Sequence, residues 1–326
     1  MGKDYSKNHI VPKRYLDRFA DKGRSQYMIG TRIIEQGKVR FFMQATENVG
    51  YEKDIYDIDY LEDPKYWEHF FAKTQDALCG KELDRIIAAA TLSAPDARIL
   101  RDHEKDILAR IMISQLLRVP SSLNHTKSIY PAISAEVKSM VRAALPLKDR
   151  RKYEQTIKRA HLSDMQIKHL HFSSAFAPTN FEKYCSLLKD RLWIVAYNTL
   201  RSNMPFVTSD HPVLVEKFFS NSKGLQVNGL SSPMTCFFFP ISPSVAIINY
   251  SCKGLLFLAD PQIDTKDPEV DEIIAAIYKL IDGKIQSLSD IAFIMEKNSS
   301  IINQAYKFSF MPQPLYDELI KDTNHN

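Results

Sequence analysis

The sequence has little of what marks the best-known classes of nucleotide-binding and metal-binding proteins. Only 10 of its 326 residues are glycine, and it has no glycine-rich phosphate loop, dinucleotide fingerprint or paired-histidine metalloprotease motif. Its 4 cysteines are widely spaced without a CxxC pair, which argues against a disulfide framework or zinc knuckle and fits a reducing cytoplasm. No apolar run approaches the roughly 20 residues that cross a bilayer. We therefore expect a cytoplasmic protein without a membrane partner.

The overall composition is that of an ordinary globular protein, with 44% hydrophobic and 25% charged residues. The net charge of +4 is unevenly distributed: residues 1–40 are basic, residues 51–68 are acidic, and residues 148–152 form another basic run. Such basic segments contact nucleic acid in some proteins and only neighbouring acids or solvent in others. Nucleic acid is therefore a hypothetical partner, and the composition does not determine the oligomeric state.

Hydrophobic periodicity predicts a single α+β domain over residues 1–326. Its centre is a helical subregion at about 64–172, followed by a sheet-rich subregion at about 181–310. The predicted helices span residues 64–90, 104–118, 130–144, 149–160, 163–170, 182–188 and 269–285, and the predicted strands span residues 192–197, 235–241, 244–250 and 291–295. We expect the helical block to pack on this mainly antiparallel sheet.

The first part of the chain predicts a small helix and a hairpin. Pro12 suits the first turn of a helix on which Tyr15, Leu16 and Phe19 share one face. Two strand-like runs, 26–34 and 38–44, then flank a short segment in which glycine is available for a tight turn.

Polar residues gather where a predicted strand ends, in the stretch from Phe206 to Val213. The stretch continues the run 192–197 across a turn, so we expect both in one sheet. Pro212 keeps His211 extended, so neighbouring side chains point to opposite faces. Ser209, Asp210 and His211 therefore cannot form a catalytic triad by themselves. The alternative is a turn in which Asp210 accepts hydrogen bonds from nearby backbone N–H groups.

The helix at 106–118 has apolar residues all round its axis, which is typical of a helix buried on nearly every side. Arg110, Gln115 and Arg118 are out of place in it. A buried arginine needs a carboxylate, backbone carbonyls or an anionic ligand, so structural ion pairing and anion binding are both open. His9, held just before the first helix, is similarly either a structural hydrogen-bonding residue or a catalyst.

Four stretches in order resemble a known family, the domain-of-unknown-function 4238 family of mainly bacterial proteins. The stretches are His9-Ile10-Val11-Pro12 with Tyr15-Leu16 and Phe19; Gln115 with Arg118 and Pro120; Phe206 with Thr208-Ser209-Asp210-His211-Pro212; and Phe239-Pro240-Ile241-Ser242-Pro243. The resemblance implies that His9, Arg118 and Asp210 belong to one recurring set. The sequence has His211 where the family more often has Asn, and Gln75 or Asp76 where a Glu is expected on the first long helix.

The first functional hypothesis is a phosphodiester hydrolase acting on nucleic acid, with one cleft between the helices and the sheet. His9 acts as general acid or base, Arg118 holds the phosphate, and Asp210 orients His9 or binds a Mg²⁺ ion. The remaining candidates are Ser209 as a catalytic residue and Gln115, Arg110, Tyr15 and His211 as substrate contacts.

The second hypothesis is a non-enzymatic module that binds a partner protein or an anionic ligand. In it the same polar residues form a buried structural network. Exposure separates the two hypotheses, because substrate must reach a catalytic cluster whereas a structural cluster is sealed.

Overall fold

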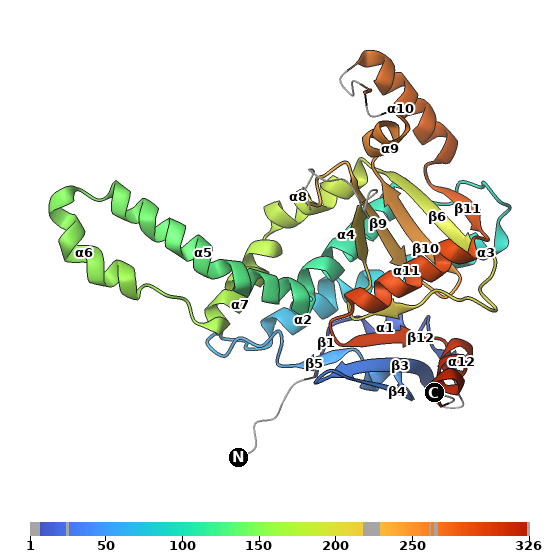
Figure 1. Cartoon of the computed structure of the whole chain (residues 1–326), viewed down its shortest axis with the longest axis horizontal. Coiled ribbons are helices and arrows are strands. Elements are labelled where there is room, and N and C mark those ends of the chain that lie inside the picture. Colours follow the sequence, from blue (N-terminus) through green and yellow to red (C-terminus); the bar gives the residue numbers. More distant parts are fainter. Residues whose placement is uncertain (1–6, 24–25, 218–228, 261, 264–266, 325–326) are drawn as a thin grey trace.

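The computed structural model describes residues 7–23, 26–217, 229–260, 262–263 and 267–324. Its central sheet has five strands in the order β11-β6-β10-β9-β8, with helices on both faces (Figure 1). The strands are β6 (Leu192–Asn198), β8 (Leu214–Lys217), β9 (Thr235–Pro240), β10 (Val245–Tyr250) and β11 (Lys284–Leu288). β11 runs parallel to β6, and the other neighbours are antiparallel. The predicted α+β class is confirmed.

Successive side chains of the central strands point to opposite faces of the sheet and so form two apolar layers. On β9, Phe237 and Phe239 belong to the large core shared with the helical block, whereas Phe238 packs on the other side. That second layer also contains Ile294 and Ile301 of α11 (Ile291–Gln304), which crosses the front of the sheet in Figure 1. A sheet covered on both faces explains why its strands are almost wholly apolar.

A second sheet has the order β2-β3-β12-β7, with β4 paired to β3. Its strands are β2 (Asp21–Lys22), β3 (Tyr27–Glu35), β4 (Lys38–Ala45), β7 (Thr208–Ser209) and β12 (Phe308–Met311). The predicted hairpin is confirmed: Gln36 and Gly37 connect β3 to β4 with φ angles of 50° and 75°. Positive φ at both turn residues matches the twist of the flanking strands.

The prediction that Thr208 and Ser209 share a sheet with residues 192–197 is wrong. β7 pairs with β12, where Ser209 lies opposite Ser309. The chain leaves β6 through a turn in which the Asn203 N–H donates to the Leu200 carbonyl. The preferred partner strand comes about a hundred residues later in the chain, and local periodicity carries no information about it.

The helical block contains α2 (Tyr66–Thr74), α3 (Lys81–Leu92), α4 (Asp102–Arg118), α5 (Pro120–Ala144), α6 (Leu147–Arg159), α7 (Asp164–Ala175) and α8 (Pro178–Lys189). The burial predicted for α4 is confirmed, since Leu108, Met112 and Ile113 are completely buried. The predicted helix 64–90 is divided instead by a 3₁₀ turn, η2 (Asp76–Cys79), and by the non-helical backbone of Gly80.

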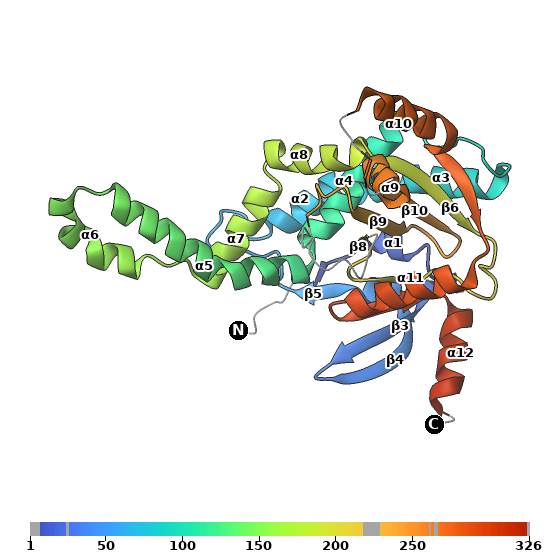
Figure 2. The same ribbon diagram turned by 45° about the horizontal axis from the view of Figure 1, so that its top comes forward.

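Helices α5 and α6 form an arm that projects away from both sheets in the two views (Figures 1 and 2). The basic run 148–152 lies on α6. Along α5, the side chains of Ile133, Val137 and Met140 are exposed. The arm therefore presents basic and apolar side chains away from the core.

The remaining elements are two short strands near the N-terminus and four helices. They are β1 (Lys7–His9), which pairs with β5 (Tyr51–Lys53), and the helices α1 (Lys13–Leu16), α9 (Cys252–Ala259), α10 (Pro268–Ile281) and α12 (Gln313–Asn324). Within the described ranges, no helix has both the length and the apolar composition needed to cross a bilayer.

The predicted strand at 291–295 is wrong, because these residues begin helix α11. A short apolar run fits either structure, and here the local cap decides: the Asp290 side chain accepts a hydrogen bond from the Phe293 N–H at 3.1 Å.

We expect Asp290→Ala to lower the free energy of unfolding by about 0.5–2 kcal/mol, because the first turn of α11 loses its capping acceptor. Urea denaturation followed by circular dichroism measures the change. Asp290→Asn keeps a side-chain oxygen at the cap and serves as the control. An equal loss in the two variants would contradict the capping role.

Candidate functional site

Arg118 is the completely buried centre of a polar cluster at the end of α4. Its side chain is 0% exposed, and its guanidinium donates to the carbonyls of Ile10 at 2.8 Å and His9 at 2.6 Å. It also forms an ion pair with Asp76 of η2 and lies 5.0 Å from the centre of the Phe71 ring. Burial alone would lower the pKa of Arg118, but the adjacent Asp76 raises it above its ordinary value. All these partners belong to the protein, so Arg118 has a structural ion pair.

His9 lies at the outer side of the same cluster and is half-buried. Its Nε2 atom is buried without a hydrogen-bond partner among the described residues. Burial lowers the pKa of His9, although Asp76 opposes the shift, so the imidazole is neutral at pH 7. Burial raises the pKa of the Glu68 carboxyl group on α2, although the positive charge of Arg118 acts to lower it. His9 is thus the member of the cluster that combines a neutral base with a ring nitrogen that has no partner.

Asp210 lies elsewhere, between β7 and the turn that precedes β12. Its carboxylate is completely buried and accepts hydrogen bonds from the backbone N–H groups of Tyr306 at 2.8 Å, Lys307 at 2.7 Å and Phe308 at 2.8 Å. Burial raises the pKa of Asp210 to about 6, against the lowering effect of these donors. Asp210 therefore has a structural role, as the alternative to catalysis proposed, but the backbone N–H groups that it satisfies lie 96 to 98 residues later in the chain and not in a turn of its own segment.

The surroundings of Asp210 do not fit a Mg²⁺ site. Mg²⁺ requires a near-octahedral shell of oxygen atoms, whereas backbone N–H donors surround this carboxylate. Across the described ranges, no three His, Cys, Asp or Glu side chains form a group able to hold a metal ion.

The neighbours of Asp210 also make local contacts. The Ser209 Oγ atom accepts a hydrogen bond from the His211 N–H at 3.1 Å, which makes a tight turn stabilised by the side chain. The His211 carbonyl in turn accepts from Gln304 of α11 at 2.6 Å. Burial lowers the pKa of His211 to about 4. These contacts fix the chain between β7 and β8.

Three predicted substrate contacts have protein partners or are sealed. The Tyr15 hydroxyl donates to the Pro240 carbonyl at 2.5 Å and lies 2.8 Å from the Thr208 hydroxyl. Arg110 pairs with Glu182 of α8. Gln115 is 2% exposed, and its Oε1 atom has no partner in the described part of the chain.

The structure thus brings His9 and Arg118 together but gives Asp210 and Ser209 separate partners. Arg118, Ser209 and Asp210 are each 0% exposed and Tyr15 is 1% exposed. By the criterion of exposure, most of the predicted residues are sealed. His9, Arg110 and His211 are partly accessible, and so is Asp76, the carboxylate next to His9.

A different group of polar residues lines a pocket of about 470 Å³, which the sequence reasoning missed. The pocket lies between α4, the end of α8 and helices α9 and α10. Four cationic side chains and three carboxylates line it, namely Lys105, Lys189, Arg191, Lys253, Asp190, Asp271 and Asp282. The uncharged lining includes Cys252 and Tyr278.

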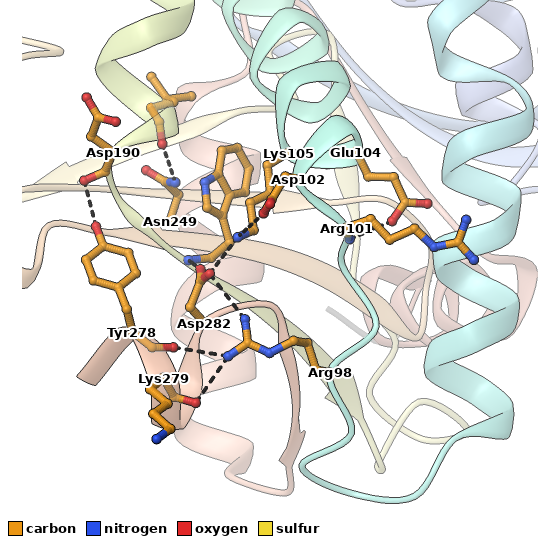
Figure 3. Close-up of polar contacts among 12 residues, drawn as sticks. Arg98, Arg101, Asp102, Glu104, Lys105, Asp190, Asn249, Tyr278, Lys279 and Asp282 are labelled. Carbon is orange, nitrogen blue, oxygen red and sulfur yellow. Dashed lines mark hydrogen bonds and ion pairs between the residues drawn. The ribbon is translucent and has the colours of Figure 1, made fainter. Parts of the chain in front are cut away.

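Asp282 is the best-compensated charge of this pocket (Figure 3). Its carboxylate pairs with Lys105 at 2.5 Å and with Arg98 at 3.6 Å, and it accepts a hydrogen bond from the Trp193 N–H at 3.0 Å. Tyr278, which also lines the pocket, donates a hydrogen bond from its hydroxyl to the Asp190 carbonyl at 2.7 Å. These contacts fasten the end of α10 to α4 and β6.

Arg191 is the opposite case, a buried cation without a carboxylate. The residue is 5% exposed, and its guanidinium donates to the carbonyls of Ser232 at 3.4 Å and Thr235. It lies 5.2 Å from the centre of the Phe237 ring, and its Nε atom has no partner among the described residues. Burial lowers the pKa of Arg191 to about 10, so the charge persists at pH 7. No Asp or Glu in the described ranges forms an ion pair with it.

The sequence contains a signal for this residue. Lys189-Asp190-Arg191 stands directly before the apolar strand 192–197, so the third charged residue is drawn toward the core at the strand entrance. Charge at the start of a buried strand is the same kind of inconsistency that identified Arg118 on α4.

The comparisons with known proteins add a family. The model described as "Protein of unknown function (DUF4238)" matches residues 7–307, which confirms the resemblance drawn from the four motifs. No curated protein matches the chain, and no solved structure does.

The lowered pKa of His211 predicts that the free energy of unfolding depends on pH. Because its pKa is about 4 in the folded protein and about 6.5 in an unfolded chain, the unfolded state takes up the proton first as the pH falls. We expect wild type to lose up to about 3 kcal/mol more stability than His211→Asn between pH 6.5 and pH 4. Urea denaturation at several pH values measures this. Equal losses in the two proteins would show that His211 is not buried in its neutral form.

Proposed function

We propose that the chain, which belongs to the DUF4238 family, is a binding protein whose Arg191 pocket holds a small anionic ligand with a phosphate or carboxylate group. The observation that carries the proposal is the buried guanidinium of Arg191, which has no carboxylate partner among the described residues. The sealed Arg118 and Asp210 clusters then stabilise the fold.

The energetic argument starts from the cost of burying a charge. A buried ion without a counter-ion costs several kcal/mol, and proteins normally pair or neutralise it. Two backbone carbonyls and one aromatic face contact Arg191 and supply only part of the lost solvation. A ligand anion would supply the missing charge, and the planar guanidinium suits phosphate and carboxylate oxygens.

The neighbouring charges favour the same class of ligand. Lys105 and Asp282 neutralise each other, and Lys189 pairs with Asp106 at 3.1 Å outside the pocket lining. Arg191 and the exposed Lys253 then have no ion-pair partner among the described residues, whereas the carboxylates of Asp190 and Asp271 are exposed to water. An anion in the pocket therefore meets two cations without an ion-pair partner there, the buried Arg191 and the exposed Lys253.

We expect inorganic phosphate to raise the melting temperature of wild type and not that of Arg191→Met. Ligand at 100 times its Kd stabilises the folded state by about 2.7 kcal/mol. Without phosphate, Arg191→Met is expected to be as stable as wild type or more stable, because the substitution removes an uncompensated charge. Thermal denaturation and isothermal titration with phosphate and with acetate measure both effects.

Arg110→Met is the matched control, since it removes an arginine from an ion pair outside the pocket and should leave the phosphate response intact. A phosphate response that persists in Arg191→Met would disprove the assignment. So would a loss of several kcal/mol of stability in that variant, because the guanidinium would then be a structural group.

A second candidate function, phosphodiester hydrolysis in nucleic acid, is favoured by one observation at His9. The imidazole is neutral and its Nε2 atom has no partner among the described residues, as a general base requires, and a substrate would reach this buried atom only by displacing the groups that cover it. The charge of Asp76 acts on His9 and favours an imidazolium, which would counterbalance a proton taken up by the ring. Arg118 is already paired, so the substrate phosphate would have to meet other cations.

If His9 is the base, His9→Asn should abolish cleavage of labelled single-stranded RNA, tRNA or duplex DNA by the purified protein. The reactions are run with Mg²⁺, Mn²⁺ or a chelator and resolved on denaturing gels. His103→Asn, at an exposed position on α4, should keep wild-type rates. Cleavage that survives in His9→Asn, or no cleavage by wild type on any substrate, would exclude this function.

A further inference from the structure

A second pocket, of about 680 Å³, lies between α2 and α7, next to the base of the arm. Four aromatic side chains line it, namely Tyr66, Trp67, His169 and Phe176, together with the apolar Leu61, Ala177 and Pro178. The rings of His169 and Phe176 each lie 6.3 Å from the Trp67 ring, and Tyr66 meets the Trp67 ring edge-on at 5.1 Å. The pocket thus has a size and composition common to sites for small organic molecules.

Two ring nitrogens of this pocket lack partners. Trp67 is 5% exposed, and its Nε1–H group has no hydrogen-bond partner in the described part of the chain. The Nδ1 atom of His169 is likewise buried and without a partner there. Buried indole N–H groups normally find an acceptor, since an unsatisfied buried donor costs about 1–3 kcal/mol. Both groups belong to residues that line one apolar pocket.

We propose that this pocket binds a planar heteroaromatic ring of the nucleobase type, which offers a ring-nitrogen or carbonyl acceptor beside an amino donor. The aromatic walls supply stacking surface, and rotation of the Trp67 and His169 rings on ligand binding would turn their buried nitrogens toward a heteroaromatic edge that satisfies them. A purely apolar ring would leave both nitrogens without partners.

The charges around the pocket separate this ligand from anions. Its lining contains Glu62 and Asp63 but no lysine or arginine, so it repels phosphate and carboxylate groups. The two carboxylates are exposed, and Asp63 already pairs with His69 at 2.8 Å. A neutral ring with an amino group is compatible with both the acidic rim and the apolar interior. The site is therefore chemically distinct from the Arg191 pocket.

Tryptophan fluorescence provides a direct test because the chain has only 2 tryptophans, of which Trp193 is completely buried in the central sheet. In a Trp193→Phe background, Trp67 is the sole reporter. We expect adenosine, which carries no negative charge, to quench this emission with saturation. Isothermal titration of the unmodified chain with adenosine gives the same Kd without any substitution.

Variants then test the polar contact. The substitution His169→Leu puts an apolar side chain of similar size in place of the imidazole and so removes its nitrogens. We expect it to weaken adenosine binding at least tenfold, as measured by titration calorimetry. His161→Leu, at an exposed position outside the pocket, should bind as wild type does. Circular dichroism melts confirm that both variants are folded.

Toluene and choline serve as ligand controls. If toluene binds as tightly as adenosine and His169→Leu has no effect, the pocket is merely apolar and the proposal is overturned. If choline binds and adenosine does not, the pocket is a site for cations, and the proposal is likewise overturned. The absence of adenosine binding to the unmodified chain would do the same, whatever the Arg191 pocket binds.

Discussion

The fold depends on a buried arginine that holds three separate segments together. Arg118 ends α4, and its guanidinium joins the backbone of His9 and Ile10 to the carboxylate of Asp76. Removing one partner of such a buried pair typically costs 3–5 kcal/mol, because the other charge stays behind without compensation. Asp76 is also the first residue of the η2 turn that divides α2 from α3. The N-terminal strand β1 is held in place by the same group.

The protein contains a second buried guanidinium, and the comparison between the two is informative. Arg118 has a carboxylate, two carbonyls and an aromatic face, so its charge is fully compensated by the protein. Arg191 has two carbonyls and an aromatic face but no carboxylate among the described residues. The same electrostatic cost therefore identifies the first as a structural group and the second as the candidate for ligand binding.

The motifs that identify the family mostly stabilise the fold. Tyr15 ties α1 to β7 and β9, and Asp210 fixes the turn before β12. His9 is the exception, because its imidazole is only half-buried and has a nitrogen without a partner. No residue of these motifs lines either of the two pockets proposed to bind ligands. The stability of the fold and the proposed ligand chemistry thus fall on largely different residues.

Local chemistry in the sequence determined the hairpin between β3 and β4, the burial of α4 and the need of Arg118 for a compensating partner. Turn residues, helical periodicity and the cost of a buried charge are properties of neighbouring residues, and they can be read without a structure. Only the tertiary structure decided which carboxylate pairs with Arg118, that β7 joins β12, and that Asp210 bonds to the backbone of Tyr306, Lys307 and Phe308. It also showed that Arg191 lacks a carboxylate among the described residues. These outcomes depend on contacts between residues far apart in the chain, and neither propensity nor spacing encodes such contacts.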